Sequence, residues 1–236
     1  MPERIGYGCS LTLRWLNQAA ELFREKLNER DYKDALQEYL SYEIESATRL
    51  RKTREILMNV WYYDCSEMGN FRQEGLDLMQ RFPEYAALIH LCLIDIAYPV
   101  FADICGYMGK LFQYHDEITT LMLKQKLFDE WGRRGSLESV VRRVTLTLKE
   151  LGFLTAKSRT RYITDKISVA NDDLVNYMLA TAMRIGTDSY YSLLELQQLS
   201  VLFPFDYHIK GDQLITDPRF AVANFNRNLN VILKDV

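Results

Sequence analysis

The sequence predicts a mainly α-helical protein with small β-hairpins, and three observations lead to this fold class. Apolar residues recur at steps of three and four over most of the 236 residues, as is typical of amphipathic helices. Alternation of the kind expected for strands is confined to short segments after residue 152. Only 5 Pro and 11 Gly are present, so long unstructured linkers are not expected. The length permits one large domain or several small ones around a buried core.

The first 110 residues are expected to form an N-terminal helical domain. The spacing of apolar residues predicts helices over about 11–29, 32–40, 43–62 and 83–98. Between the last two helices, Gly69 and Gly75 indicate a loop. Pro83 suits the first turn of a helix, because the N–H that proline lacks has no intrahelical partner at that position.

The most apolar stretch is "YAALIHLCLIDIAYPVFADICGYM", residues 85–108. It is interrupted by His90, Asp95, Pro99 and Asp103. A membrane span needs about 20 nearly uncharged apolar residues, which this stretch does not provide. We therefore expect a core helix that breaks near Pro99, with His90 as a buried core histidine, and we expect no membrane partner.

Two helices and a small hairpin are expected between residues 111 and 166. The helical pattern is interrupted near His115, and a new helix is predicted over 137–151, with Ser136 placed to cap it. Gly152 stands where a left-handed C-terminal cap is expected. "FLTA" then reads as a strand, "KSRT" as a turn and "RYIT" as the returning strand. This order is the winged helix-turn-helix pattern, so we expect a helical bundle that contains winged helix-turn-helix elements.

The predicted winged-helix element is basic although the chain is acidic. The chain has 29 Lys and Arg against 32 Asp and Glu, a net charge of −3. Between Gly132 and Asp165, 8 basic residues stand against 3 acidic ones, a net charge of +5. A helix of such an element can enter the DNA major groove while the hairpin reaches nearby phosphates. The predicted DNA contacts are Arg133, Arg134, Arg142, Arg143, Lys149, Lys157, Ser158, Arg159 and Arg161, with the Thr160 hydroxyl beside them.

A second basic cluster occurs in "TRLRKTR" within the helix expected over 43–62. It consists of Arg49, Arg51, Lys52 and Arg54. These four positions are spread around a helix, which is typical of a solvated face. They can equally serve as a second set of backbone contacts on the same duplex, which would position it without reading its sequence.

The remaining residues, 167–236, predict a C-terminal α+β region. Helices are expected over 172–184 and 189–199. "FPFDYHIKGDQLIT" suggests a β-hairpin with Gly211 and Asp212 as its turn, and "NLNVILK" suggests a final strand. The sequence leaves open whether the hairpin belongs to a second winged helix.

Residues suited to catalysis or metal binding are sparse. The four cysteines lie far apart and only three histidines are present, whereas a structural zinc site needs about four clustered ligands. We expect the cysteines to be reduced thiols of a cytoplasmic protein. The chain contains neither of the common phosphate-binding glycine loops. No enzymatic activity, cofactor or metal is predicted.

Five segments in order resemble one known family. They are "YGCSLT", "LRKTREI", "PEYAALIHLCLIDIAYPVFADI", "VVRRVTLTLKELGFL" and "LFPF". Together they look like the BrxA family of the bacterial BREX phage-defence systems. The resemblance implies a mostly helical, non-enzymatic protein that binds double-stranded DNA and acts beside other defence-system proteins, among them a methyltransferase and an ATPase. By motif position it implies Arg142, Arg143 and the hairpin from Lys157 to Arg161 as contacts.

Two other functions stay open. A winged helix can be a protein–protein adaptor, and Leu146, opposite the apolar stripe of its helix, together with 15 tyrosines would suit such a surface. A metal-dependent hydrolase around His115 and Asp116 is the third reading, although the spacing of other His and Asp residues does not demand it. The sequence predicts neither a DNA sequence preference nor an oligomeric state.

Overall fold

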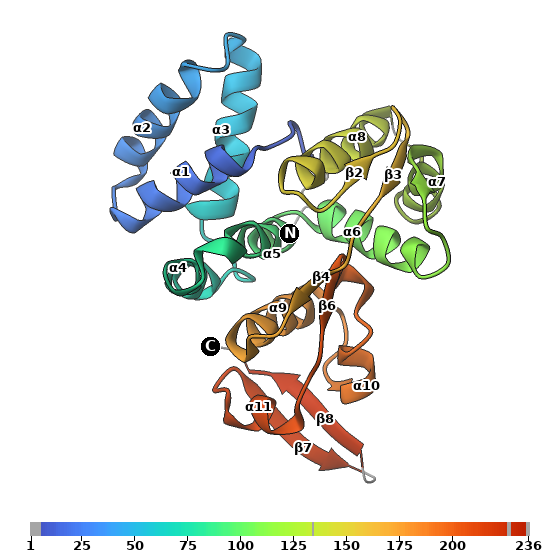
Figure 1. Cartoon of the computed structure of the whole chain (residues 1–236). Coiled ribbons are helices and arrows are strands. Elements are labelled where there is room, and N and C mark those ends of the chain that lie inside the picture. Colours follow the sequence, from blue (N-terminus) through green and yellow to red (C-terminus); the bar gives the residue numbers. More distant parts are fainter. Residues whose placement is uncertain (1–5, 134, 226–227, 235–236) are drawn as a thin grey trace.

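The computed structural model describes residues 6–133, 135–225 and 228–234 (Figure 1). Within these ranges the chain forms eleven α-helices, two 3-10 helices and eight short strands. An N-terminal helical part is followed by two smaller parts in which helices are combined with strands. The predicted mainly α fold with small β elements is therefore confirmed.

The helical part contains five α-helices and one 3-10 helix. They are α1 (Leu13–Arg24), α2 (Glu29–Ser41), α3 (Ala47–Trp61), α4 (Phe71–Arg81), η1 (Pro83–Tyr85) and α5 (Ala86–Ala97). The first three begin where a polar side chain accepts a hydrogen bond from the backbone N–H three residues later. These capping residues are Thr12, Asn28 and Ser46.

Helix α4 corrects the loop expected around Gly69 and Gly75. Gly75 lies inside the helix, where a Cβ atom would come within 2.8 Å of Ile89 Cγ2. Glycine is required at position 75 because α4 packs closely on α5, and not because the chain turns there. Phe71 and Leu76 of α4 are also buried, and α4 packs against α5.

Helix α5 is the centre of the core, with ten of its twelve residues buried. It packs against helices of both the N-terminal and the C-terminal parts. The His90 ring is enclosed, with Nδ1 accepting from Trp61 Nε1 at 3.3 Å and Nε2 lying 2.8 Å from Asn17 Oδ1. Since indole N–H can only donate, Nε2 carries the ring proton. Burial lowers the pKa of His90 to about 3, so the ring is a neutral core residue as expected.

The apolar run bends sharply at Pro99, where α5 gives way to α6 (Pro99–Phe112). The direction of the chain changes by 119° between the helical segments 83–97 and 99–112. Among the described residues, no single helix has both the length and the hydropathy of a membrane span, and only this bent pair reaches them jointly.

Helix α6 begins the first α/β unit, residues 99–163. It continues with β1 (Ile118–Thr119), α7 (Thr120–Trp131), α8 (Gly135–Glu150), β2 (Thr155–Ala156) and β3 (Arg161–Ile163). Strand β3 lies between β1 and β2 and is antiparallel to both, with Tyr162 opposite Ile118 and Ala156. Because α8 already begins at Gly135, Ser136 belongs to its first turn and does not precede the helix as predicted.

The second α/β unit, residues 172–233, repeats this order with one 3-10 helix and one strand inserted before its last helix. Its elements are α9 (Asp172–Ile185), β5 (Tyr191–Ser192), α10 (Leu193–Leu196), η2 (Ser200–Leu202), β6 (Phe205–Tyr207), α11 (Gly211–Thr216), β7 (Phe220–Phe225) and β8 (Asn228–Leu233). Strand β8 lies between β5 and β7 and is antiparallel to both. Strand β6 pairs in parallel with β4 (Ile167–Val169), which follows the first unit.

Two C-terminal predictions are wrong. The expected hairpin around Gly211 is instead the helix α11, because Gln213 is buried against α9, where its Nε2 donates to Asn176 Oδ1 at 2.9 Å. The true hairpin is β7–β8, whose second strand was expected. The helix expected over 189–199 is reduced to α10, since Tyr191 and Ser192 pair with β8 as strand β5.

Candidate nucleic-acid interface

Helix α8 presents a narrow exposed stripe. Its core side is apolar and buried, as the spacing of Val140, Val144 and Leu148 predicts. Arg142 and Lys149 are exposed on the opposite side, with the half-buried Leu146 between them. The helix ends as expected at Gly152, which has a φ of +82°. The stripe therefore offers two freely accessible cationic side chains on one face.

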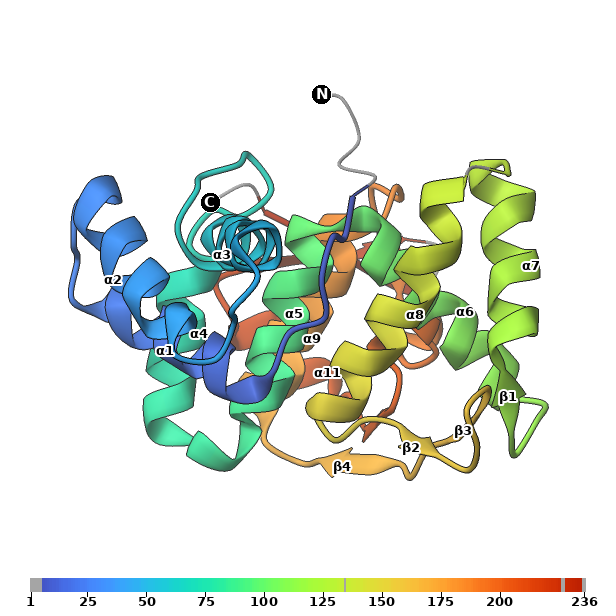
Figure 2. The ribbon, with the colours of Figure 1, turned by 90° about the horizontal axis from the view of Figure 1, so that it is seen from above.

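A segment for which the sequence predicted no contact with α8 covers one flank of this helix. Residues 7–11, called here the N-terminal strap, run along the helix on the side toward α3 (Figure 2). Thr147 Oγ1 lies 2.8 Å from the Tyr7 hydroxyl and accepts from Leu11 N–H at 3.0 Å. Tyr7 and Leu11 are fully buried. Thr145 and Thr147 of α8 are both buried, although no local pattern in the sequence indicated a cover on this flank.

The strap also engages one predicted contact residue. Arg143 Nη1 donates to the carbonyl oxygen of Tyr7 at 3.2 Å, which leaves the arginine half-buried. Arg143 thus differs from Arg142, whose side chain is exposed. The helix contacts expected from the sequence therefore divide into an accessible pair, Arg142 and Lys149, and a partly engaged Arg143.

The basic hairpin forms where it was predicted. Residues 157–160 make a turn closed by Lys157 N–H donating to the Arg161 carbonyl at 3.0 Å. Lys157, Ser158 and Arg159 are exposed on this turn. Thr160 contributes its carbonyl oxygen to Thr120 N–H at 3.0 Å, which holds the turn against the start of α7.

Two further predicted contacts have partners within the chain. Arg161 Nη1 lies 3.1 Å from Glu117 Oε1 across the β1–β3 pair, so its charge is partly neutralised. The Arg133 guanidinium lies 5.8 Å from the centre of the Phe128 ring, a cation–π contact on an exposed surface. Arg134 lies outside the described residues.

The four residues of the second basic cluster, on α3, differ in exposure. Arg49, Arg51 and Lys52 are exposed, while Arg54 is half-buried and donates to Gln37 Oε1 at 2.7 Å. The stem of Lys52 packs beside Gly8, where a Cβ atom would lie 3.8 Å from Lys52 Cδ. The strap thus contacts α3 on one side and α8 on the other, and it links the two basic regions.

The two α/β units carry charges of opposite sign. The first unit has 11 Lys and Arg against 7 Asp and Glu, a net charge of +4. The second has 4 against 7, a net charge of −3. Of the two units, only the first has the sign of charge that attracts polyanions.

The hydrolase reading gains no support from the described residues. His115 and Asp116 are exposed in the connection between α6 and β1. Over the described part of the chain, no three His, Cys, Asp or Glu side chains are grouped so that they could hold a metal ion. All four cysteines are free thiols, and Cys92 and Cys105 are buried.

Comparisons with known proteins add no identity. No family model, curated protein or solved structure matches the chain. The function is therefore argued from the geometry and charge of the chain itself.

Proposed function

We propose that the protein is a non-enzymatic double-stranded-DNA-binding accessory protein and that its first α/β unit is a winged helix. The element order of the unit and the central position of β3 in its sheet support this reading. The observation that carries it is the exposed cationic surface made by α8 and the adjoining turn, in a chain of net charge −3. Arg142 and Lys149 supply the helix side, and Lys157 and Arg159 supply the turn.

In this proposal α8 lies in the major groove, which is wide enough to accept a helix. Lys157 and Arg159 then reach the neighbouring phosphates from the turn, and the Ser158 hydroxyl is an additional donor. Leu146, between the cationic residues of α8, is placed to contact a thymine methyl group. The strap is hydrogen-bonded to α8 through Thr147 and Arg143 and would support the helix in this position.

The exposed residues of α3 extend this surface in the proposal. Arg49, Arg51 and Lys52 lie beyond the strap and would contact backbone phosphates, which fixes the orientation of a duplex but reads no sequence. Arg54 takes no part, because its guanidinium is held by Gln37 and Glu55.

The resemblance to the BrxA family suggests a biological context for this activity. DNA binding without catalysis is what that resemblance implies, and it places the protein beside other proteins of a bacterial phage-defence system. Both this context and those partners are part of the proposal.

A protein–protein adaptor is the second candidate, and a specific surface favours it. Tyr114 and Leu121, on either side of β1, are 83% and 64% exposed. With the half-buried Leu146 they give the first unit accessible apolar side chains of the kind that interface centres use. In that case its positive charge would serve solubility.

Fluorescence anisotropy with a labelled duplex distinguishes the two candidates. The variants are Arg142→Ala/Lys149→Ala on α8 and Lys157→Ala/Arg159→Ala on the turn. The matched control is Arg24→Ala/Arg30→Ala, which removes two exposed positive charges from α1 and α2. DNA binding through the first unit predicts weaker binding in both site variants and unchanged binding in the control. Absence of DNA binding by the wild-type protein at low salt would favour the adaptor function.

A further inference from the structure

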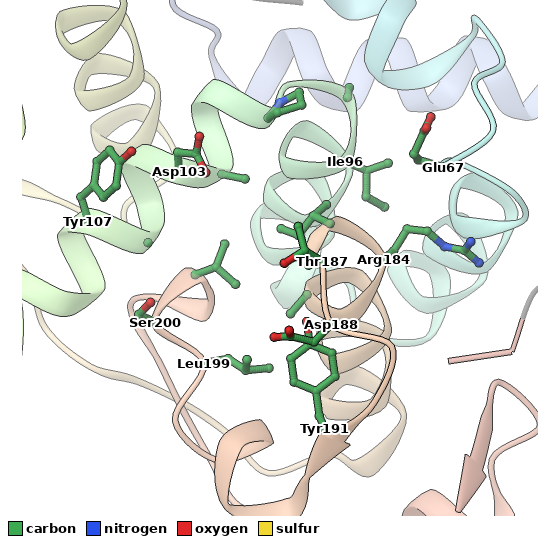
Figure 3. A pocket seen from close by; sticks show the side chains of 18 of the residues that line it. Glu67, Ile96, Asp103, Tyr107, Arg184, Thr187, Asp188, Tyr191, Leu199 and Ser200 are labelled. Carbon is green, nitrogen blue, oxygen red and sulfur yellow. The ribbon is translucent and has the colours of Figure 1, made fainter. Parts of the chain in front are cut away.

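A cavity of about 700 Å³ lies between α6, the end of α9 and η2, away from the surface proposed for DNA (Figure 3). Its size falls within the range of small-ligand sites, about 300–1,000 Å³. One wall is made by α6, a second by residues 182–188 and a third by residues 199–201, and Cys65 and Glu67 line one side. Both α/β units therefore contribute to it.

The wall between the two units is held by direct backbone packing. A Cβ atom at Gly109 would overlap the carbonyl oxygen of Ser200 and would lie 3.1 Å from its Cα. Gly106, one turn earlier, also faces Ser200 and lines the cavity. This contact joins two walls of the cavity, because α6 and η2 cannot separate without losing it.

Part of the cavity lining is apolar. Ile96 and Ala97 come from the end of α5, and Leu199 and Val201 come from the segment around η2. In Figure 3, Ile96 and Leu199 lie on opposite sides of the space. An alkyl chain would bury apolar surface here, which stabilises a complex in proportion to the area removed from water.

Two carboxylates on one side of the cavity are held by aromatic donors. Asp103 Oδ2 accepts from Trp131 Nε1 at 2.8 Å, and Glu130 Oε2 accepts from the Tyr107 hydroxyl at 2.8 Å. Burial, and then the hydrogen bond to Glu130, raise the pKa of Tyr107, so this hydroxyl stays a donor. These contacts hold both carboxylates at the α6–α7 side of the cavity.

The remaining charges lie toward the other side. Glu67 and Arg184 are placed opposite Asp103, and Asp188 lies beside Tyr191 (Figure 3). A hydrogen bond from the Ser66 side chain is the main cause of the lowered pKa of Glu67, which keeps that carboxylate ionised at neutral pH. With Lys110 counted, four carboxylates face two cations around the cavity. The lining therefore has a net charge of −2.

We propose that this cavity binds an alkylammonium group. The ammonium lies between Asp103 and Glu130 and next to the Tyr107 ring, where charge-assisted hydrogen bonds and a cation–π contact are available. The alkyl stem packs on Ile96, Leu199 and Val201. A free polyamine and a lysine side chain of a partner protein share this chemistry. The inference does not depend on DNA binding.

Isothermal titration calorimetry of the full chain tests the proposal with two probes, spermidine and a short peptide with blocked termini whose only charged residue is a lysine. The site variant is Asp103→Asn/Glu130→Gln. It removes two charges but keeps oxygens that accept from Trp131 and Tyr107, so its thermal unfolding should match the wild type. The control is Asp172→Asn/Asp212→Asn, in a second acidic cavity of about 410 Å³ between α9 and α11 whose lining is almost entirely polar.

The expected result is that at least one probe binds the wild type and the control alike, and binds the site variant about tenfold or more weakly. Tighter binding of spermidine would identify a free amine as the ligand, and tighter binding of the peptide would identify a partner's lysine. Equal weakening in both variants would reveal only general attraction to acidic surface and would overturn the proposal. Failure of both probes to bind the wild type would also overturn it.

Discussion

The two α/β units share an arrangement but differ in charge, in the lengths of their helices and in the insertion of η2 and β6 in the second unit. In each, a short strand leads into a helix that is capped by a hydroxyl, which accepts from the backbone N–H three residues later; the capping residue is Thr119 in the first unit and Ser192 in the second. In each, the last strand is central in the sheet. Yet the helix before the hairpin has 16 residues in the first unit and 6 in the second. The first unit has a net charge of +4 and the second one of −3.

The comparison indicates that the packing of the strands and the charge of the surface vary independently. Ile118 opposite Tyr162 and Tyr191 opposite Val231 are buried pairs at corresponding places, so the same strand order is maintained by apolar contacts. Exposed charge is not needed for that packing and can diverge. The positive unit suits a polyanion, and the negative unit would be repelled by one.

The largest expected effect comes from making the first unit resemble the second in charge. Arg142→Glu/Lys149→Glu should weaken DNA binding at least about a hundredfold, because two phosphate contacts become repulsions. The measurement is anisotropy at fixed salt. Asp172→Asn/Asp212→Asn in the second unit is the comparison and should change affinity less than about threefold, since these groups lie away from the duplex. Similar effects in both units would contradict the assignment.

A second change tests the contact that joins the units. Gly109→Ala forces a methyl group against the Ser200 backbone and should lower the free energy of unfolding by about 2 kcal/mol. Chemical denaturation measures this. Gly106→Ala is the matched control, because its Cβ would lie 3.8 Å from Ser200 Oγ, an ordinary contact. If both variants unfolded alike, the close approach of α6 and η2 would not be present in solution.

The third prediction concerns the core that supports both units, since α5 packs on α6 and α9. The folded pKa of His90 is about 3, below the ordinary value of 6.5, so the unfolded chain binds the proton more readily. Stability should therefore fall as pH drops from about 6.5 toward 3, by up to about 1.4 kcal/mol per pH unit. His90→Gln should flatten this dependence in denaturation measured across that range. An unchanged slope would show that other groups cause it.

The smallest expected effect comes from releasing one cation of the first unit. Glu117→Gln removes the partner of Arg161 and should strengthen DNA binding by less than about threefold, because exposed ion pairs contribute little. Asp129→Asn on α7 changes the net charge equally and should have no comparable effect. Weaker binding after Glu117→Gln would indicate that the ion pair positions the turn.

The sequence predicted the helices and the basic hairpin of the first unit because their signals are local. Apolar spacing placed α8, and Gly152 marked its end. Contacts between distant residues were not accessible in this way. The strap meets α8 through Tyr7 and Thr147, 140 positions apart, and no local pattern indicates that pairing.

The C-terminal errors have the same origin. In "HIKGDQLIT" polar and apolar residues alternate in part, as in a strand. Gln213 and Leu214 are nevertheless buried, and α11 packs against α9 and β7, so that tertiary contacts stabilise a helix here. Gly75 appeared to mark a loop because its close neighbours, Ile89 and Tyr177, come from other helices. For the candidate site, the sequence supplied the charges, while the structure showed that Arg54, Arg143 and Arg161 are engaged within the chain.

The measurement that tests the central claim most directly is the salt dependence of duplex binding by the full chain. The four exposed cations of the first unit, Arg142, Lys149, Lys157 and Arg159, should contribute about −3.6 to the slope of log K against log salt, at about −0.9 per phosphate. Arg142→Ala/Lys149→Ala should reduce this contribution to about −1.8 by the same relation, and the total slope should become shallower by the difference. A wild-type slope near zero, or one that the variant leaves unchanged, would contradict the assignment of the first unit as the DNA-binding surface.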